Sequence, residues 1–145
     1  GQLTELAAKA DSDSLGLKCV PTFSGTRLDP LQAGTLTGMT PGNLTPANFA
    51  RSVLEGMAEN YRNALDQIFR FTGQPASSLT LVGAGNGLRE NSVLADAVAR
   101  RFGLRPMVTQ HREEAAFGAA LVGGVAAGVF SSFDEAGRLV SYQTL

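Results

Sequence analysis

Apolar residues recur at spacings of three and four between Thr45 and Gly73, the longest periodic stretch of the chain. This spacing is typical of a helix with one continuous apolar face. Thr45 can cap such a helix, and Pro46 suits its first position because proline lacks the N–H that would need a partner there. Gly73 and Pro75 end the pattern. We therefore predict a long core helix whose apolar positions are Phe49, Val53, Leu54, Met57, Tyr61, Leu65, Ile68 and Phe69.

Shorter stretches with the same spacing predict four further helices. The first covers residues 1–10 and is ended by a polar run of Asp and Ser. A second runs from about Asn91 to Phe102, with Gly103 just beyond its end. A third begins near Arg112, and a last short helix follows the capping-box sequence of residues 132–135.

Strand signals are fewer and shorter. Residues 17–23 look extended, residues 24–45 form a long irregular loop rich in Gly, Pro and Thr, and residues 79–82 and 106–109 are two short strands. The tail, residues 139–145, is ambiguous. Helices alternating with strands predict an α/β fold with parallel strands. Parallel sheets normally contain more than two strands, so we expect the rest of the sheet to be missing from this chain or supplied by another.

Composition places the chain among ordinary globular proteins. It has 145 residues, 43% hydrophobic and 17% charged, which is enough for one packed core. Its 12 basic and 13 acidic residues give a net charge of −1 and form no block of like charge, which argues against nucleic acid as a partner. Cys19 is the only cysteine and cannot form an internal disulfide, so a reducing, cytoplasmic compartment is favoured.

The uncharged run of residues 115–130 raises the question of a membrane span. It is shorter than the roughly 20 residues needed to cross the hydrocarbon core, and most of its side chains are small. We predict a buried helix there and no membrane partner. The first residues show no secretory signal, and Gly1 in place of methionine suggests a piece of a longer chain.

Three glycines, Gly83, Gly85 and Gly87, lie between a predicted strand and a predicted helix. Backbone N–H groups in such a turn can bind phosphate oxygens, although a purely structural turn is also consistent with the pattern. A P-loop would need Lys followed by Ser or Thr, which is absent. A dinucleotide fingerprint would need glycine at Leu88, and a methyltransferase motif an acidic residue at Leu81. A Rossmann-type domain binding S-adenosylmethionine or a dinucleotide and a non-enzymatic α/β interaction module remain as alternatives.

The motifs taken together resemble a known family. Residues 82–96 and 113–121 are similar to the adenosine-binding region of the FGGY carbohydrate kinases, which belong to the actin-like and hexokinase-like ATPases. Residues 20–30 and 50–57 are similar to two upstream motifs of that family, in the family's order and spacing. The resemblance covers about residues 17–135 and implies a fragment of the actin-like, ribonuclease H-like ATPase fold.

This resemblance implies that residues 1–145 are part of the C-terminal nucleotide-binding lobe, with residues 1–16 as an N-terminal helix and linker. It implies ATP-dependent phosphorylation of a sugar hydroxyl with Mg²⁺, and within the family the motifs look most like sedoheptulokinase. The family's catalytic Asp and most of its sugar site match nothing in this chain, so the resemblance implies an N-terminal lobe as partner and no catalysis by this chain alone. The residues it places at the nucleotide are Gly83, Ala84, Gly85, Asn86 and Gly87.

Other residues have simpler interpretations than catalysis. We expect His111, the only histidine, to be a solvated loop residue. Glu113 and Glu114 are adjacent and point about 100° apart on a helix, so they favour the positive end of its dipole rather than forming a carboxylate pair. Arg27 is expected to order its loop.

Overall fold

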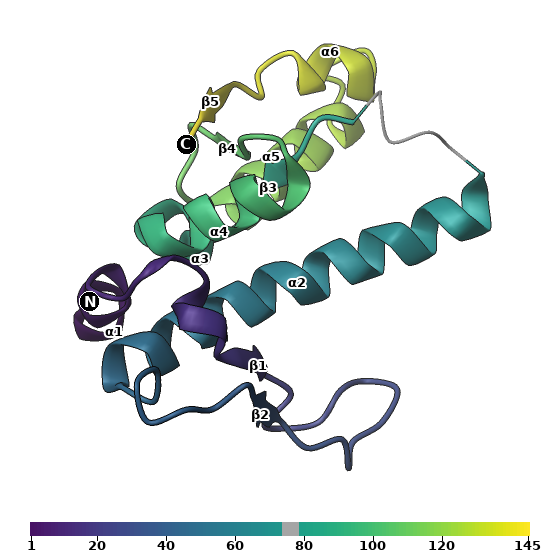
Figure 1. Cartoon of the computed structure of the whole chain (residues 1–145). Helices are drawn as coiled ribbons and strands as arrows, with labels where there is room; N and C mark the ends of the chain where they lie inside the picture. The colour runs from purple at the N-terminus through teal and green to yellow at the C-terminus, as the bar shows by residue number, and fades with distance from the viewer. Residues whose placement is uncertain (74–78) are drawn as a thin grey trace.

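The computed structural model describes residues 1–73 and 79–145. In Figure 1 the long helix α2 crosses the molecule, with β1 and β2 on one side and the remaining strands with α3 to α6 on the other. The elements are α1 (Gln2–Ala8), the 3₁₀ turn η1 (Ser12–Gly16), β1 (Lys18–Val20), β2 (Thr35–Thr37), α2 (Pro46–Thr72), β3 (Val82–Gly83), α3 (Asn86–Glu90), α4 (Ser92–Phe102), β4 (Met107–Thr109), α5 (Glu114–Ala126), α6 (Phe133–Gly137) and β5 (Tyr142–Thr144).

Helix α2 confirms the predicted long helix and both of its ends. The Thr45 hydroxyl accepts a hydrogen bond from the Asn48 N–H at 3.1 Å, and Gly73 closes the helix with a left-handed φ of +68°. Pro75, the other predicted stop, lies outside the described residues. The prediction that the whole apolar face is core is wrong, because burial is confined to the half of α2 that ends at Ala58. Beyond it, Ile68 is 55% exposed.

The core lies where that buried half of α2 meets its neighbours. One cluster joins α2 to α4, and a second joins α1, α2 and α4. The residues of the first are small or branched, so the two helices approach closely. Glycine at position 56 lets β1 approach from another direction, since a side chain there would overlap the carbonyl oxygen of Cys19. The buried apolar residues of the two clusters are Ala58, Leu94, Ala97 and Val98, and Ala7, Ala50 and Val93.

A left-handed turn leads into β1. Three consecutive non-glycine residues, Asp13, Ser14 and Leu15, have φ values of +57°, +49° and +51°. Such a conformation is unfavourable for each of them, so contacts must hold the turn in place. Ser14 is fully buried and donates a hydrogen bond to Glu55 of α2 at 2.9 Å. The side-chain amide of Asn43 donates to the Leu15 carbonyl at 3.0 Å.

The strands form two small sheets. Strands β3 and β4 are parallel, as predicted, and β5 pairs with β4 antiparallel, so the order is β3-β4-β5. The predicted strand over residues 79–82 is wrong in extent, since pairing begins only at Val82. The ambiguous tail contributes β5. The predicted irregular loop over residues 24–45 is also wrong in part, because Thr35–Thr37 forms β2 against β1.

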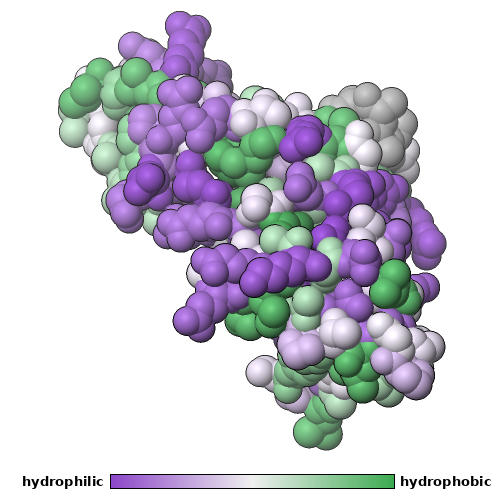
Figure 2. All heavy atoms as spheres, turned by 60° about the vertical axis from the view of Figure 1, so that its left-hand side comes forward, coloured by the Kyte–Doolittle hydropathy of each residue, from purple (hydrophilic) through white to green (hydrophobic). Residues whose placement is uncertain are grey.

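Helix α5 confirms the helix predicted after Arg112, but the prediction that it is buried is wrong. None of its residues is buried among the described residues, and Val122 is 55% exposed. Its interior glycine Gly124 lies against the ring of Phe130, in the turn that follows. Figure 2 shows hydrophobic side chains scattered between hydrophilic ones over one face of the molecule. Within residues 1–73 and 79–145, no helix combines the length and apolarity needed to cross a membrane.

Helices α4 and α6 begin at the capping residues that the sequence indicates. The Asn91 side chain caps α4 by accepting from the Leu94 N–H at 3.1 Å, and Gly103 ends it at φ +66°. Helix α3, which precedes it, was not predicted. Ser132 caps α6 by accepting from the Glu135 N–H at 3.2 Å, as the capping box predicts.

We predict that Gly56→Ala destabilises the chain while Gly118→Ala does not. The added methyl at position 56 has no space beside Cys19, which should cost about 1–3 kcal/mol of unfolding free energy. At Gly118, inside α5, a methyl meets nothing within 4 Å, so the better helix propensity of alanine should add about 0.5–1 kcal/mol. Urea unfolding of the two variants measures both changes. Equal changes would contradict the close approach of β1 to α2.

Candidate functional site

The glycine turn lies at the carboxyl end of β3. Gly83 ends the strand, Ala84 and Gly85 form the turn, and Asn86 and Gly87 begin α3. In α/β folds, ligands bind beyond the carboxyl ends of parallel strands, and this turn has that position. The five residues expected at the nucleotide are consecutive and run from the end of β3 into α3.

The three glycines differ in whether the fold requires them. Gly85 has φ +81°, which L side chains rarely adopt. A side chain at Gly83 would overlap the end of the Leu88 side chain. Gly87 has neither restriction, because its φ lies outside the left-handed region and an added Cβ would meet nothing within 4 Å. Nothing in the described chain therefore requires glycine at position 87.

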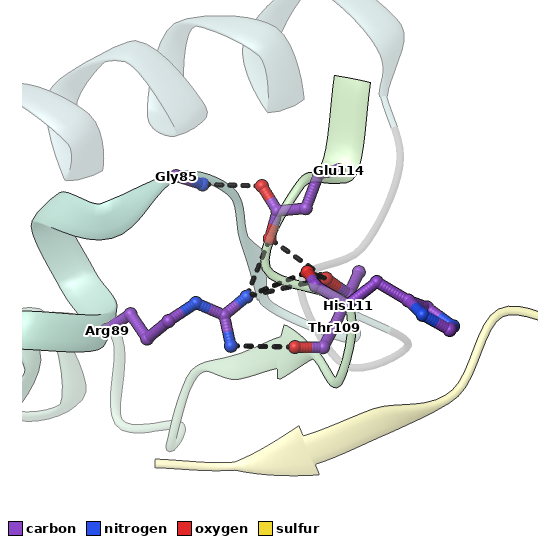
Figure 3. Close-up of polar contacts among 5 residues, drawn as sticks. All are labelled: Gly85, Arg89, Thr109, His111 and Glu114. Atoms are coloured by element: carbon purple, nitrogen blue, oxygen red, sulfur yellow. Dashed lines mark hydrogen bonds and ion pairs between the residues drawn. The ribbon is translucent and has the colours of Figure 1, made fainter. Parts of the chain in front are cut away.

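A polar cluster joins the glycine turn to the carboxyl end of β4 (Figure 3). One carboxylate oxygen of Glu114, Oε2, accepts a hydrogen bond from the Gly85 N–H at 2.6 Å. The other, Oε1, accepts from Arg89 Nη2 at 2.8 Å and from the Thr109 hydroxyl at 2.9 Å. Glu114 thus connects the first turn of α5 with the glycine turn, with α3 and with the end of β4.

Arg89, on α3, makes the remaining contacts of the cluster. Its Nη1 donates to the Thr109 carbonyl at 2.8 Å, and Nη2 lies 3.5 Å from the His111 carbonyl. The side chain is only 12% exposed, and its Nε has no partner among the described residues. Arg89 therefore satisfies backbone carbonyls that the end of a strand leaves free. The guanidinium is directed into the protein rather than toward a ligand.

Sequence reasoning missed this cluster. The sequence alone predicts only a helix-dipole role for Glu114 and indicates no role for Arg89. The available signal was that each follows one of two predicted parallel strands, whose carboxyl ends lie at the same edge of a sheet. The adjacent Glu113 is the N-cap residue of α5 and makes no capping hydrogen bond with its side chain. Both carboxylates lie at the N-terminal end of α5, as predicted.

His111 lies in the loop after β4, as predicted, but its ring is only partly exposed to solvent. Its ring stacks on Phe117 of α5, with 3.7 Å between ring centroids and an angle of 19° between the planes. Its Nε2 lies 3.3 Å from the Leu139 carbonyl. These contacts give His111 a packing role that ties the end of β4 to α5 and to the segment before β5.

The pKa of Glu114 is lowered from the ordinary value of a glutamate. The largest cause is the hydrogen bond from the Gly85 backbone, followed by the hydrogen bond from the Thr109 hydroxyl, and Arg89 adds a smaller effect. Each of these donors stabilises the ionised carboxylate. Glu114 is therefore charged at neutral pH, and the cluster is fully formed there.

The described residues offer no evident metal site. Across the described ranges, no group of three or more His, Cys, Asp or Glu side chains comes close enough to hold a metal ion. A cavity of about 660 Å³ lies elsewhere, between β1, α2 and α4, and Glu55, Arg100 and Arg101 are among its lining residues. Four of its charged side chains pair with one another, Arg100 with Glu55 and Arg101 with Glu59. The glycine turn remains the candidate site.

Comparison with known proteins gives consistent matches in sequence. Residues 1–127 match the model of the FGGY family of carbohydrate kinases, C-terminal domain. Glycerol kinase from Pseudomonas savastanoi pv. phaseolicola is 35% identical over 135 residues, which cover 91% of this chain and 26% of that protein. Glycerol kinase from Bordetella parapertussis is 36% identical over 134 residues, covering 90% of this chain and 25% of that protein. The chain thus spans about a quarter of the length of these relatives.

Solved structures show the same fold. Ligand-bound xylulose kinase from Lactobacillus acidophilus aligns with a TM-score of 0.81 at 21% identity, over 97% of this chain and 28% of that one. Glycerol kinase from Plasmodium falciparum with ADP aligns with a TM-score of 0.74 at 22% identity, over 92% and 26% of the two chains. The predicted fold class, part of the actin-like ATPase fold, is confirmed.

We predict that the contribution of Glu114 to stability depends on pH. Because its pKa is lower in the folded chain, the ionised carboxylate stabilises the fold at neutral pH. That contribution is lost as the pH falls from about 4.3, the usual glutamate value, through the lowered pKa. Urea unfolding of the chain and of Glu114→Gln at several pH values measures it. We expect the difference between the two to be largest near pH 7 and to shrink in acid, and a difference independent of pH would contradict the cluster.

Proposed function

We propose that this chain, which belongs to the FGGY family of carbohydrate kinases, forms the adenine-nucleotide side of an ATP-dependent sugar kinase. The nucleotide would lie against the glycine turn at the carboxyl end of β3. Family membership and the position of the turn support this proposal. The residues proposed to contact the nucleotide are Gly83, Ala84, Gly85, Asn86 and Gly87.

The position of the glycine turn at the carboxyl end of β3 is the observation that carries the proposal, and Gly87 is consistent with it. Gly87 lies in the first turn of α3, and neither its backbone conformation nor a neighbouring atom requires glycine there. A missing side chain in an open position leaves room for a group outside the described chain. A nucleotide that approaches the backbone closely accounts for that room, and the Asn86 amide beside it can donate and accept hydrogen bonds to a base or ribose.

The reaction that this family membership supports is transfer of the terminal phosphate of ATP to a sugar hydroxyl. Such transfer depends on positioning and on neutralising charge from both sides of a cleft. Mg²⁺ would accompany the nucleotide by binding its phosphates, because this ion usually takes only one or two protein carboxylates. We propose that an N-terminal lobe, which also carries the catalytic Asp and most of the sugar site, is the partner of this chain. A cytoplasmic location would suit the single, buried Cys19.

The sugar is not assigned by the residues of this chain. The relatives reported above are glycerol and xylulose kinases, and another similar structure is a gluconate kinase from Lactobacillus acidophilus. These names do not support sedoheptulose, which the motif comparison favoured. We propose a ketose or polyol hydroxyl as the acceptor and leave the choice to an assay of the whole kinase.

We predict that the chain binds ADP in preference to NAD and S-adenosylmethionine. Isothermal titration calorimetry with the three ligands under identical conditions distinguishes the proposed kinase from the two alternatives. Tighter binding of NAD or S-adenosylmethionine would favour the Rossmann-type hypothesis. Binding of none of the three would favour the interaction-module hypothesis.

We predict that Gly87→Ala weakens ADP binding without destabilising the chain. The added methyl has space in the described structure but would occupy the proposed nucleotide position, so we expect at least about a tenfold loss of affinity, equivalent to about 1.4 kcal/mol. Gly123→Ala in α5 is the matched control, because its methyl also meets nothing within 4 Å. Calorimetry with ADP and urea unfolding measure affinity and stability. Unchanged affinity in Gly87→Ala would remove the turn from the nucleotide site.

We predict that the chain alone does not transfer phosphate. Its residues provide one side of the proposed site and no catalytic carboxylate that the family resemblance identifies. A coupled assay of ADP release with glycerol, xylulose and sedoheptulose should show no sugar-dependent turnover. Sugar-dependent ATP consumption by these 145 residues would refute the proposed division between lobes.

A further inference from the structure

We propose that Glu114, held in place by Arg89, is a positioning residue that sets the conformation of the glycine turn before the nucleotide binds. This inference rests on the proposed function and assigns roles to two residues outside the proposed contact set. It starts from one contact: the Gly85 N–H donates to Glu114 Oε2 at 2.6 Å, across a sequence separation of 29 residues. A hydrogen bond to a charged carboxylate is among the stronger ones in proteins.

The Glu114 carboxylate, which binds the glycine turn, is itself fixed by hydrogen bonds from other side chains. Its second oxygen accepts from both Arg89 and Thr109, and the Glu114 and Arg89 side chains are only 19% and 12% exposed. Arg89 is in turn bonded to the Thr109 carbonyl at 2.8 Å. Every member of this chain of contacts is thus tied to a neighbouring element. A side chain fixed in this way can determine the position of the group that it binds.

The contact also decides which donors of the turn remain for a ligand. The Gly85 N–H is already used, and the negative charge of Glu114 beside it disfavours a phosphate oxygen there. An anionic ligand is therefore directed toward the exposed backbone that follows, at Asn86 and Gly87, since Gly83 is buried within β3. Since Gly85 adopts a left-handed φ of +81°, the contact also holds a conformation that a free loop would visit only part of the time.

Glu114→Gln tests the proposal, with Glu113→Gln as the matched control. The glutamine keeps the shape of the side chain but replaces one acceptor oxygen by a donor, so it cannot bind Gly85, Arg89 and Thr109 together. The control removes the same charge from the adjacent residue, whose side chain makes no capping hydrogen bond. Two quantities are measured on each chain: hydrogen exchange of the Gly85 amide by NMR, and ADP affinity by calorimetry. Urea unfolding checks that each variant is folded.

We expect slow exchange of the Gly85 amide in the unsubstituted chain without nucleotide and in Glu113→Gln, and faster exchange in Glu114→Gln. ADP affinity should fall about tenfold in Glu114→Gln and remain unchanged in the control. Arg89→Lys keeps the charge but loses the planar fork, so it should give a smaller change in the same direction and carries the test if Glu114→Gln does not fold. Restoring acceptors with Glu114→Asp should recover part of the exchange protection.

Two negative outcomes are distinct. If the unsubstituted chain binds ADP and Glu114→Gln binds it equally well, Glu114 has only a structural role and the inference is overturned while the proposed function stands. If the unsubstituted chain binds no ADP, the proposed function fails and the inference fails with it. Fast exchange of the Gly85 amide in the unsubstituted chain also overturns the inference, whatever the affinity.

Discussion

Close packing of the first half of α2 is the constraint on which the rest of the structure depends. On one side its small residues, among them Ala58, contact Ala97 and Val98 of α4, and on another Gly56 admits the backbone of β1. The segments before and after α2 are thereby joined through one helix (Figure 1). A larger side chain at either contact would separate elements that share few other contacts, because tightly packed interfaces cannot absorb added volume without strain.

The packing of α4 on α2 determines where the glycine turn and the end of β4 lie. Helix α4 connects two parallel strands, so the carboxyl ends of β3 and β4 lie side by side. The turn after β3 and the helix after β4 then face each other, and Glu114 and Arg89 join them across this edge. The candidate site is therefore a product of strand direction: antiparallel pairing would place these two loops at opposite ends of the sheet.

Some apolar surface remains exposed on the described chain. The second half of α2 and the whole of α5 carry apolar side chains that no described element buries. The sequence predicts such helices to be core helices, because periodicity shows which side chains share a face. It does not show whether another element covers that face. The relatives that this chain matches are about four times as long, and a kinase built on the same fold would bring further elements to these surfaces.

The sequence by itself determined what depends on local chemistry: the extent of α2 from Thr45 to Gly73, the caps of α4 and α6, the parallel pair of strands, and the glycine turn with its family resemblance. Tertiary structure decided what depends on distant partners. Strands β2 and β5 exist because β1 and β4 offer free edges, and Glu114 reaches Gly85 because two strand ends coincide. Caps and periodicity act within a few residues and can be read along the chain, whereas burial and long-range hydrogen bonds are settled only when separate elements pack.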